Sequence, residues 1–425
     1  MTNLAIINGT VYWEGRLQKG DVLIQDGKVR SFGDRIGVPA GVEVFDAEGY
    51  GVFPGFADVH VHLREPGFSY KETIQTGTQA AARGGFTLVC AMPNLSPAVD
   101  SKQTLAAEQA LIDRDALIRV LPYAAITMGQ RGEELVDMEG LAGSCVAFSD
   151  DGRGVQDAEM MRAAMKAAAG LGKVIAAHCE DESLIPKGAC IHDGSYARAH
   201  GLVGIPCASE YEQAVRDIGL AEQTGCRYHV CHVSCRETVG AIRDAKQKGL
   251  PVSGEVTPHH LAFCDDDLQD DGRFKMNPPL RSAEDRAALI EGVRDGTLEV
   301  IATDHAPHSA EEKAGGLLKS AMGVVGLELC FAAVNTHLCR PGHIDLAQLV
   351  EMMSIRPREL MGLPWGIRIG EPADLVVVDP ERAFVVDPQT FASKGRSTPF
   401  EGRTLWGDIL LTICDGRTVY RKSSD

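Results

Sequence analysis

The sequence has no long apolar run, no CxxC cysteine pair and no excess of positive charge. No stretch of about 18 residues is both apolar and uncharged, so we expect no membrane-spanning helix. The absence of a CxxC motif argues against a zinc ribbon or a thioredoxin-type redox site. Lys and Arg total 42 against 59 Asp and Glu, a net charge of −17 that disfavours general binding of nucleic acid or anionic membranes. We therefore expect neither nucleic acid nor a membrane as a partner.

The opening residues, MTNLAIINGTVYWEG, have no basic segment followed by an apolar core. We therefore expect no secretory signal and a cytoplasmic location. In that compartment the 12 cysteines are expected to be reduced and structural. The cysteine spacing that could suggest a metal site is that of Cys231 and Cys235, in CHVSC. We interpret these two cysteines as bracketing a strand end rather than binding a metal.

What is present indicates a globular α/β protein of 425 residues, with 44% hydrophobic and 24% charged residues. Both ends of the chain alternate short apolar runs with Gly and Asp turns, including a hairpin signal at QDGK. The middle has a different texture, of apolar runs separated by helical stretches. We therefore predict a small β-sandwich domain built from residues 1–52 plus 366–425, and a larger domain over residues 53–365.

Eight strand candidates alternate with helical stretches in the larger domain. This alternation implies parallel pairing, and eight units in about 300 residues fit a (β/α)₈ barrel of the TIM type. A doubly wound sheet is the structural alternative. The strand candidates are residues 56–62, 86–92, 118–127, 145–151, 174–180, 228–234, 251–257 and 300–305.

Polar side chains gather where these strands end. Side chains two residues apart on a strand point the same way, so His60 and His62 can face one ion. In a barrel these strand ends converge on the face where active sites lie. Four imidazoles and two carboxylates suit zinc, manganese or cobalt, and six ligands fit two ions about 3.5–4 Å apart. The predicted ligands are His60, His62, the Asp150–Asp151 pair, His178, His232 and Asp304.

The remaining histidines have simpler interpretations. His192, His200, His337 and His343 lie away from strand ends and are predicted to be surface or packing residues. His229 is three residues before His232 and is expected to point to the other side of its strand. His259 and His260 follow a strand candidate and could line the barrel mouth without binding metal.

A family resemblance adds to this interpretation. The chain resembles the dihydroorotases of the amidohydrolase superfamily, with matching motifs in the same order along nearly its whole length. Several of these motifs are specific to the dihydroorotases. The motifs are FPGFADVHVHLREPG (53–67), AMPN (91–94), FSDDG (148–152), AHCE (177–180), HVCHVS (229–234), GEVTPHHL (254–261), KMNPPLR (275–281), ATDHAPH (302–308) and GEPADLVVVD (370–379).

The resemblance implies the reversible cyclisation of N-carbamoyl-L-aspartate to L-dihydroorotate with loss of water, the third step of pyrimidine synthesis. It implies two divalent ions, with Zn²⁺ favoured, and the metal ligands that it assigns are His60, His62, Asp151, His178, His232 and Asp304. It assigns the substrate carboxylate to Arg64, Asn94 and His308, and contact with the ring or its amide to Asn277. We also expect a homodimer, and association with aspartate carbamoyltransferase stays open.

One departure from many relatives concerns the fourth strand. Hydantoinases and allantoinases bridge their metals with a carbamylated lysine there, whereas this strand reads CVAFSDDG and has no lysine. The resemblance is to the dihydroorotase branch in which the second Asp of DDG takes that place, so Asp151 is the predicted bridge. Activity is then expected to be independent of bicarbonate.

The residues also suggest a mechanism and two alternative functions. Asp304 is the candidate general base, because it ends a strand beside the predicted metals. The planar guanidinium of Arg64 can form two parallel hydrogen bonds to a carboxylate. Two other functions are considered: a cyclic-amide hydrolase of the hydantoinase or allantoinase type, and a non-catalytic subunit that scaffolds aspartate carbamoyltransferase. All six predicted ligands are present, which argues against the scaffold alone.

Overall fold

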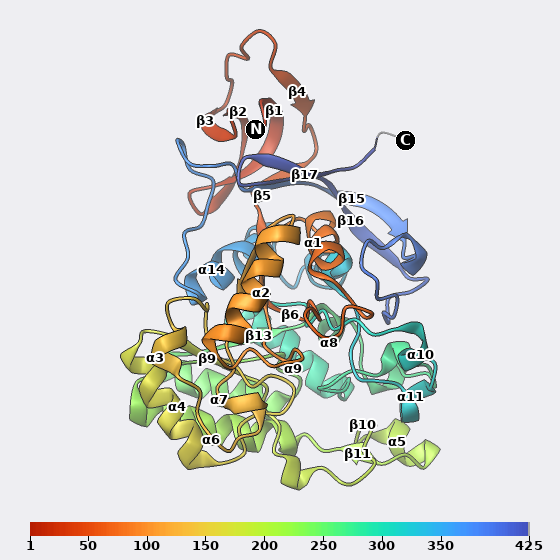
Figure 1. Cartoon of the computed structure of the whole chain (residues 1–425). Helices are drawn as coiled ribbons and strands as arrows, with labels where there is room; N and C mark the ends of the chain where they lie inside the picture. The colour runs from red at the N-terminus through yellow and green to blue at the C-terminus, as the bar shows by residue number, and fades with distance from the viewer. Residues whose placement is uncertain (424–425) are drawn as a thin grey trace.

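The two ends of the chain form one β layer above a larger α/β part, as the computed structural model of residues 1–423 shows (Figure 1). Its strands are joined in the order β17-β16-β15-β5-β1-β2-β3, and β4 pairs with β1. The last two residues of the predicted terminal domain, 424 and 425, lie outside the described residues. The strands are β1 (Leu4–Trp13), β2 (Arg16–Gln25), β3 (Lys28–Gly33), β4 (Glu43–Asp46), β5 (Gly51–Pro54), β15 (Leu375–Val385), β16 (Thr404–Cys414) and β17 (Arg417–Arg421).

Local sequence explains both the turn and the join in this layer. The hairpin predicted at QDGK is confirmed between β2 and β3, where Asp26 and Gly27 both have positive φ angles. The N- and C-terminal segments meet where β5 pairs antiparallel with β15, with Val52 opposite Val377. Apolar side chains from both segments pack into one cluster, which stabilises the join.

Below this layer, parallel strands close into a barrel. Neighbouring strands pair in the order β6-β7-β8 and in the order β9-β12-β13-β14. A bridge between Val61 and His305 closes the cylinder. The predicted barrel is therefore confirmed. Its strands are β6 (Phe56–Val61), β7 (Phe86–Ala91), β8 (Arg119–Pro122), β9 (Val174–Ala177), β12 (Arg227–Val230), β13 (Val252–Val256) and β14 (Val300–Ile301).

The strand predicted over residues 145–151 is present but shorter than expected, with ladder hydrogen bonds confined to residues 146–149. Only Phe148 makes bridges there, to Ala124 and to Ile175, although it occupies the fourth position of the barrel. The chain leaves the ladder because Asp150 turns back and accepts hydrogen bonds from the amides of Ile126 and Thr127. The predicted strands 118–127 and 300–305 are likewise shorter than expected.

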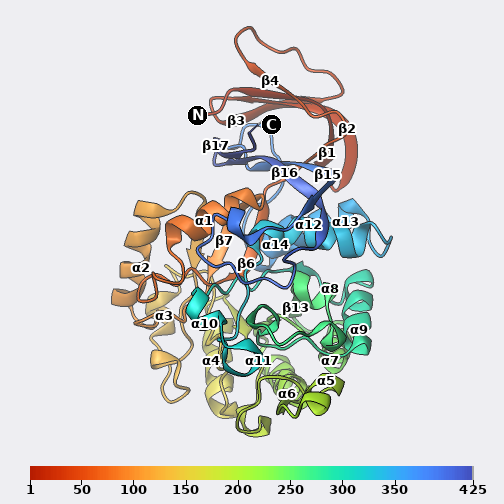
Figure 2. The ribbon, with the colours of Figure 1, turned by 90° about the vertical axis from the view of Figure 1, so that its right-hand side faces the viewer.

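Helices surround the barrel (Figure 2). In α4 the buried residues Met161, Ala164, Met165 and Ala168 share one face, as expected for an amphipathic helix. The helices are α1 (Ile74–Arg83), α2 (Lys102–Asp115), α3 (Met138–Leu141), α4 (Ala158–Gly170), α5 (Ser195–His200), α6 (Ala208–Thr224), α7 (Arg236–Gln247), α8 (Pro258–Ala262), α9 (Ala283–Arg294), α10 (Ala310–Lys313), α11 (Gly316–Lys319), α12 (Cys330–Val334), α13 (Leu346–Val350) and α14 (Arg356–Leu360). A short parallel pair, β10 (Ile191–His192) and β11 (Gly204–Ile205), lies outside the barrel sheet. Within residues 1–423, no helix has both the length and the apolar character needed to cross a bilayer.

Candidate metal centre

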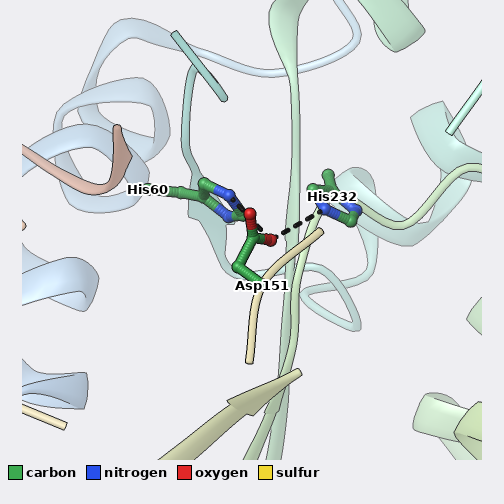
Figure 3. Close-up of side chains that lie close together, drawn as sticks. All are labelled: His60, Asp151 and His232. Atoms are coloured by element: carbon green, nitrogen blue, oxygen red, sulfur yellow. Dashed lines mark ion pairs between the residues drawn. The ribbon is translucent and has the colours of Figure 1, made fainter. Parts of the chain in front are cut away.

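The six predicted ligand side chains meet at the carboxyl ends of the barrel strands. His60 lies in β6, His178 follows β9 directly, and His232 follows β12 by two residues. None of the six residues is more than 7% exposed. Figure 3 shows that three of them, His60, Asp151 and His232, point toward one another although they come from distant parts of the chain.

Asp151 lies at the middle of the group. Its Oδ1 is 3.3 Å from His60 Nε2, 3.6 Å from His232 Nε2 and 3.8 Å from His178 Nδ1. Its Oδ2 is 3.5 Å from His62 Nε2. This one carboxylate is therefore within 4 Å of a nitrogen of each of the four histidines. Its neighbour Asp150 points away, so the structure separates the two members of the DDG pair.

Asp304 completes the side of the group formed by His60 and His62. Its Oδ1 is 3.0 Å from His62 Nε2 and 3.6 Å from His60 Nε2. On the opposite side, His178 Nδ1 and His232 Nε2 face each other at 3.0 Å.

Several of these contacts bring together atoms that both carry lone pairs. His62 Nδ1 donates to Asn94 Oδ1 at 2.9 Å, so in neutral His62 the Nε2 lone pair faces the Asp304 carboxylate. Among the described residues, His60 Nε2 and Asp151 Oδ1 are buried without a hydrogen-bond partner. Two lone pairs at this distance need a proton or a metal cation between them. The donor set therefore fits divalent cations.

The ligand atoms define two overlapping groups that could each hold an ion. His60, His62 and Asp304 form one group, and His60, Asp151 and His232 form another. In both groups all ligand atoms lie within 4.8 Å of one another. Burial alone would raise the pKa of Asp151, but the charge of His60 and the nearby imidazole of His232 hold that pKa well below its ordinary value. The pKa of Asp304 is lowered in the same way, against burial, by His62 and His60.

Glu255, in β13, is a functional residue that sequence reasoning missed. His60 Nδ1 donates to Glu255 Oε1 at 2.7 Å, which turns His60 Nε2 toward the centre. The same oxygen accepts from the backbone amide of His232 at 3.1 Å, and Oε2 accepts from His229 Nε2 at 3.0 Å. One carboxylate therefore holds two predicted ligands and explains why His229 is buried. The signal in the sequence was a lone carboxylate inside an apolar strand candidate.

Strained backbone marks three of the predicted site residues. Arg64, His232 and Asp304 have φ angles of 61°, 33° and 45°, although none is glycine. Such conformations cost of order 1–3 kcal/mol each and gather at functional sites. These backbone conformations change the direction of the three side chains where the strands end.

The four residues predicted to bind substrate lie around the same mouth. The amide Nδ2 of Asn94 donates to Asp151 Oδ2 at 3.3 Å, and Arg64 Nε donates to the carbonyl of Pro307 at 3.3 Å. Asn277 Nδ2 donates to Glu180 Oε1 at 3.0 Å and lies 3.4 Å from His178 Nε2.

His308 has its two ring nitrogens engaged. Its Nε2 donates to the carbonyl of Met322 at 2.8 Å, and its Nδ1 accepts from Lys71 Nζ at 3.3 Å. Burial and the nearby charges of Arg64 and Lys71 lower the pKa of His308 to about 3, so its imidazole is neutral. Lys71 is a second cation at this edge that sequence reasoning did not identify.

His260 does not face the mouth with a free nitrogen, because Thr257 and the carbonyl of Pro278 bind both of its nitrogens. His259 is buried, and its Nε2 is without a partner in residues 1–423. His192 is buried as well, which agrees with the packing alternative of its prediction.

A cavity of about 480 Å³ lies elsewhere, between the start of β6 and the segment that leads into β15. Its polar groups satisfy one another: Arg119 pairs with Asp374 at 3.0 Å, and Arg358 donates to the carbonyl of Gly55 at 2.7 Å. The cavity therefore lacks the group of unpaired ligand atoms found at the mouth.

Known proteins resemble this chain in sequence and in fold. A family model described as "Dihydro-orotase-like" matches residues 49–238. The chain is 51% identical over 422 residues to a dihydroorotase of Listeria innocua, covering 98% of this chain and 99% of the relative. It is 49% identical over 414 residues to a dihydroorotase of Bacillus cytotoxicus, covering 97% and 96%.

Solved structures share the whole architecture. An L-hydantoinase (dihydropyrimidinase) from Arthrobacter aurescens superimposes with a TM-score of 0.88 at 25% identity, covering 100% of this chain and 97% of that one. A dihydropyrimidinase from Brevibacillus agri superimposes with a TM-score of 0.86 at 25% identity, covering 99% and 95%. The sequence relatives agree along almost the entire chain, and from them we conclude that this chain belongs to the dihydroorotase family.

Proposed function

We propose that the protein is a dihydroorotase, which interconverts N-carbamoyl-L-aspartate and L-dihydroorotate in the third step of pyrimidine synthesis. The observation that carries this proposal is the position of Asp151, within 4 Å of all four predicted histidine ligands and within hydrogen-bond distance of Asn94. A polar centre and a predicted carboxylate-binding group therefore share one barrel mouth. The relatives named dihydroorotase support the same reaction.

Two divalent ions, with zinc favoured, are the proposed cofactors. His60, His62 and Asp304 would hold one ion, His178 and His232 the other, and Asp151 would lie between them. The lone-pair contacts of His62 with Asp304 and of His60 with Asp151 support this arrangement, as does the absence of a lysine from the fourth barrel position. When bound, such ions supply a water of lowered pKa and polarise the ring carbonyl.

Asp304 is the proposed proton carrier. Its carboxylate is ionised at neutral pH, because His62 and His60 lower its pKa despite burial. In the hydrolytic direction it would take a proton as water adds to the ring carbonyl carbon. It would then give that proton to the ring nitrogen as the C–N bond breaks. The biosynthetic direction reverses these steps.

Arg64, Asn94 and His308 are proposed to bind the substrate carboxylate, with Asn277 near the ring. Neutral His308 would have to release Met322 or Lys71 to use a ring nitrogen, whereas Arg64 has its terminal nitrogens to offer. In a chain of charge −17, an anionic substrate needs such local cations.

A hydantoinase-like activity is the second candidate, favoured by the likeness to solved hydantoinases. The two candidates differ in the ring carboxylate that Arg64 would bind. Comparing kcat/KM for dihydroorotate with that for dihydrouracil and hydantoin distinguishes them. We expect dihydroorotate to be preferred by at least about 10²-fold, because a buried cation without its carboxylate partner is costly.

The experiment that tests the mechanism replaces Asp304 with Asn. We expect the variant to fold and to keep the zinc of the His178 side while it binds zinc more weakly on the His60 side, and kcat should fall by about 10³-fold in both directions even when zinc is saturating. Circular dichroism and metal analysis of the same sample separate loss of chemistry from loss of structure. A near-normal kcat would reject Asp304 as the proton carrier.

We also propose that the protein is a cytoplasmic homodimer that is active without added bicarbonate. We propose that each chain has two domains, one of residues 1–52 plus 366–425 and one of residues 53–365. Sedimentation of the purified protein, alone and with aspartate carbamoyltransferase, tests the assembly. Assays in bicarbonate-free buffer test the Asp151 bridge, since a carbamylated lysine would require carbon dioxide.

A further inference from the structure

Two cysteines from distant segments lie together outside the metal centre. Cys207 and Cys235 have sulfur atoms within 4.8 Å of each other, and Cys235 Sγ is 4.0 Å from the carbonyl oxygen of Cys207. Of the 12 cysteines, only Cys207 and Cys339 are partly exposed, and the other ten are buried. The sequence drew attention to Cys231 and Cys235, but the fold pairs Cys235 with Cys207. This pair combines an accessible thiol with a buried one.

Both cysteines stand at the start of long helices. Cys207 is the N-cap of α6, which has 17 residues, and Cys235 is the N-cap of α7, which has 12. A helix N-terminus carries a partial positive charge, which favours a thiolate over a thiol.

The surroundings of Cys207 contain an imidazole, a nearby guanidinium and two carboxylates, Asp285 and Glu237. His192 and Asp285 have ligand atoms within 4.8 Å of Cys207 Sγ. Arg281 Nη1 donates to the carbonyl of Ile205 at 2.7 Å and lies 3.4 Å from His192 Nδ1. The contact with Cys235 and, against burial, the nearby His192 and Arg281 lower the pKa of Cys207.

Cys235 has the opposite surroundings. Its Sγ is 3.3 Å from Glu210 Oε1, a buried carboxylate that also accepts the backbone amides of Ser234 and Cys235. The contact with Cys207, burial and the charge of Glu210 all raise the pKa of Cys235. Cys207 is therefore placed to attack a disulfide first, and Cys235 is placed to attack the mixed disulfide that results.

We propose that Cys207 and Cys235 form a reversible redox pair that reacts with low-molecular-weight disulfides of the glutathione type. The Cys207 thiolate attacks one sulfur of the small disulfide, forms a mixed disulfide and releases one small thiolate. Cys235 then loses its proton, attacks Cys207 Sγ and releases the second small thiolate. The protein dithiol is oxidised to a disulfide, and the small disulfide is reduced to two thiols.

A metal ion is a less suitable occupant of this cluster, although its donor types would allow one. The Arg281 guanidinium already places a cation beside His192. Asp285 accepts from the backbone amide of Arg236 at 3.1 Å and from Ser282 Oγ at 2.7 Å, so its carboxylate is committed to helix capping. Metal binding is therefore an outcome that the experiment must be able to detect.

The test treats the native enzyme with oxidised glutathione, traps remaining thiols with N-ethylmaleimide in denaturant and maps the peptides by mass spectrometry. We expect a Cys207–Cys235 disulfide that dithiothreitol reverses. In a Cys235→Ser variant, Cys207 should keep one glutathionyl group, because no second thiol displaces it. In a Cys207→Ser variant, Cys235 should stay unmodified.

Cys339, partly exposed but away from this cluster, is the matched control. Cys207 should react with iodoacetamide at least about tenfold faster than Cys339, and the Cys339→Ser variant should still form the disulfide. Three results would each overturn the proposal: no Cys207–Cys235 link while Cys339 is glutathionylated, modification of Cys235 in the Cys207→Ser variant, or thiols that react only after a chelator removes bound metal.

Discussion

The two sides of the candidate metal centre are built differently. On the first side, His60, His62 and Asp304 bring a carboxylate of their own, and Glu255 and Asn94 fix both imidazoles by hydrogen bonds of 2.7 and 2.9 Å. On the second side, His178 and His232 face each other at 3.0 Å, and Asp151 is the carboxylate that contacts both of them as well as the first side.

This difference predicts unequal affinity for two ions. An ion on the His60 side would have Asp304 and a share of Asp151 as ligands, whereas an ion on the His178 side would have its share of Asp151 and only the more remote Glu180 carboxylate, which contacts the outer nitrogen of His178. Coulomb attraction grows with the number of nearby carboxylates and is strong in a buried site. We therefore expect tight binding on the His60 side and weaker binding on the His178 side.

Replacing Asp151 with Ala removes the one carboxylate that both sides share, so it should have the largest effect. We expect kcat/KM for dihydroorotate to fall at least about 10³-fold and bound zinc to fall on both sides. The matched control is Asp157→Ala, an exposed carboxylate that caps α4 through Met160 N at 2.8 Å. It should cost about 1 kcal/mol of stability and leave metal binding unchanged. Full zinc content in Asp151→Ala would contradict the bridging role.

Replacing one histidine on each side tests the asymmetry directly. His178→Ala should lose one ion and keep the other with its affinity little changed. His62→Ala should weaken the tighter ion by about 10²-fold, because it removes a ligand that faces both carboxylates. Isothermal titration of metal-stripped variants measures both. Equal losses of zinc affinity in the two variants would show that the two sides are equivalent.

Replacing Arg64 with Ala separates substrate binding from the metals on the same side. We expect KM for both substrates to rise by about 10²-fold, with zinc content unchanged, because a charged hydrogen bond to the substrate carboxylate is lost. Arg153→Ala is the control, since Arg153 is exposed in the loop after Asp151. An unchanged KM in Arg64→Ala would place the carboxylate site elsewhere.

The smallest effect is expected from Glu255→Gln, which keeps the shape but removes the charge behind His60. Metal affinity should fall by about 10- to 100-fold, mainly on the His60 side. Glu108→Gln is a suitable control, because Glu108 is also buried but lies on α2. If both substitutions change zinc affinity alike, the effect comes from burial rather than from the contact with His60.

Some of this arrangement was predictable from the sequence, because the period of a strand fixes which side chains share a face. His60 and His62 are two residues apart, and the barrel pattern placed the other ligands at strand ends. Choosing Asp151 over Asp150 needed the family resemblance, and the fold supplies the reason, since Asp150 binds backbone amides instead.

Other features depend on contacts between distant segments, which spacing does not reveal. Glu255 acts on residues 195 and 23 positions away, and Cys235 meets Cys207 rather than its neighbour Cys231. The strand over residues 145–151 was overestimated because a run of apolar residues does not show where a polar side chain will bind the backbone.

The most direct test of the central claim is stepwise reconstitution of the metal-stripped enzyme with zinc, with bound metal measured by mass spectrometry and dihydroorotate hydrolysis measured at each step. We expect two bound zinc ions per chain, the first bound more tightly than the second, and hydrolysis that depends on them. Binding of a single ion, or full hydrolysis by the metal-free chain, would contradict it.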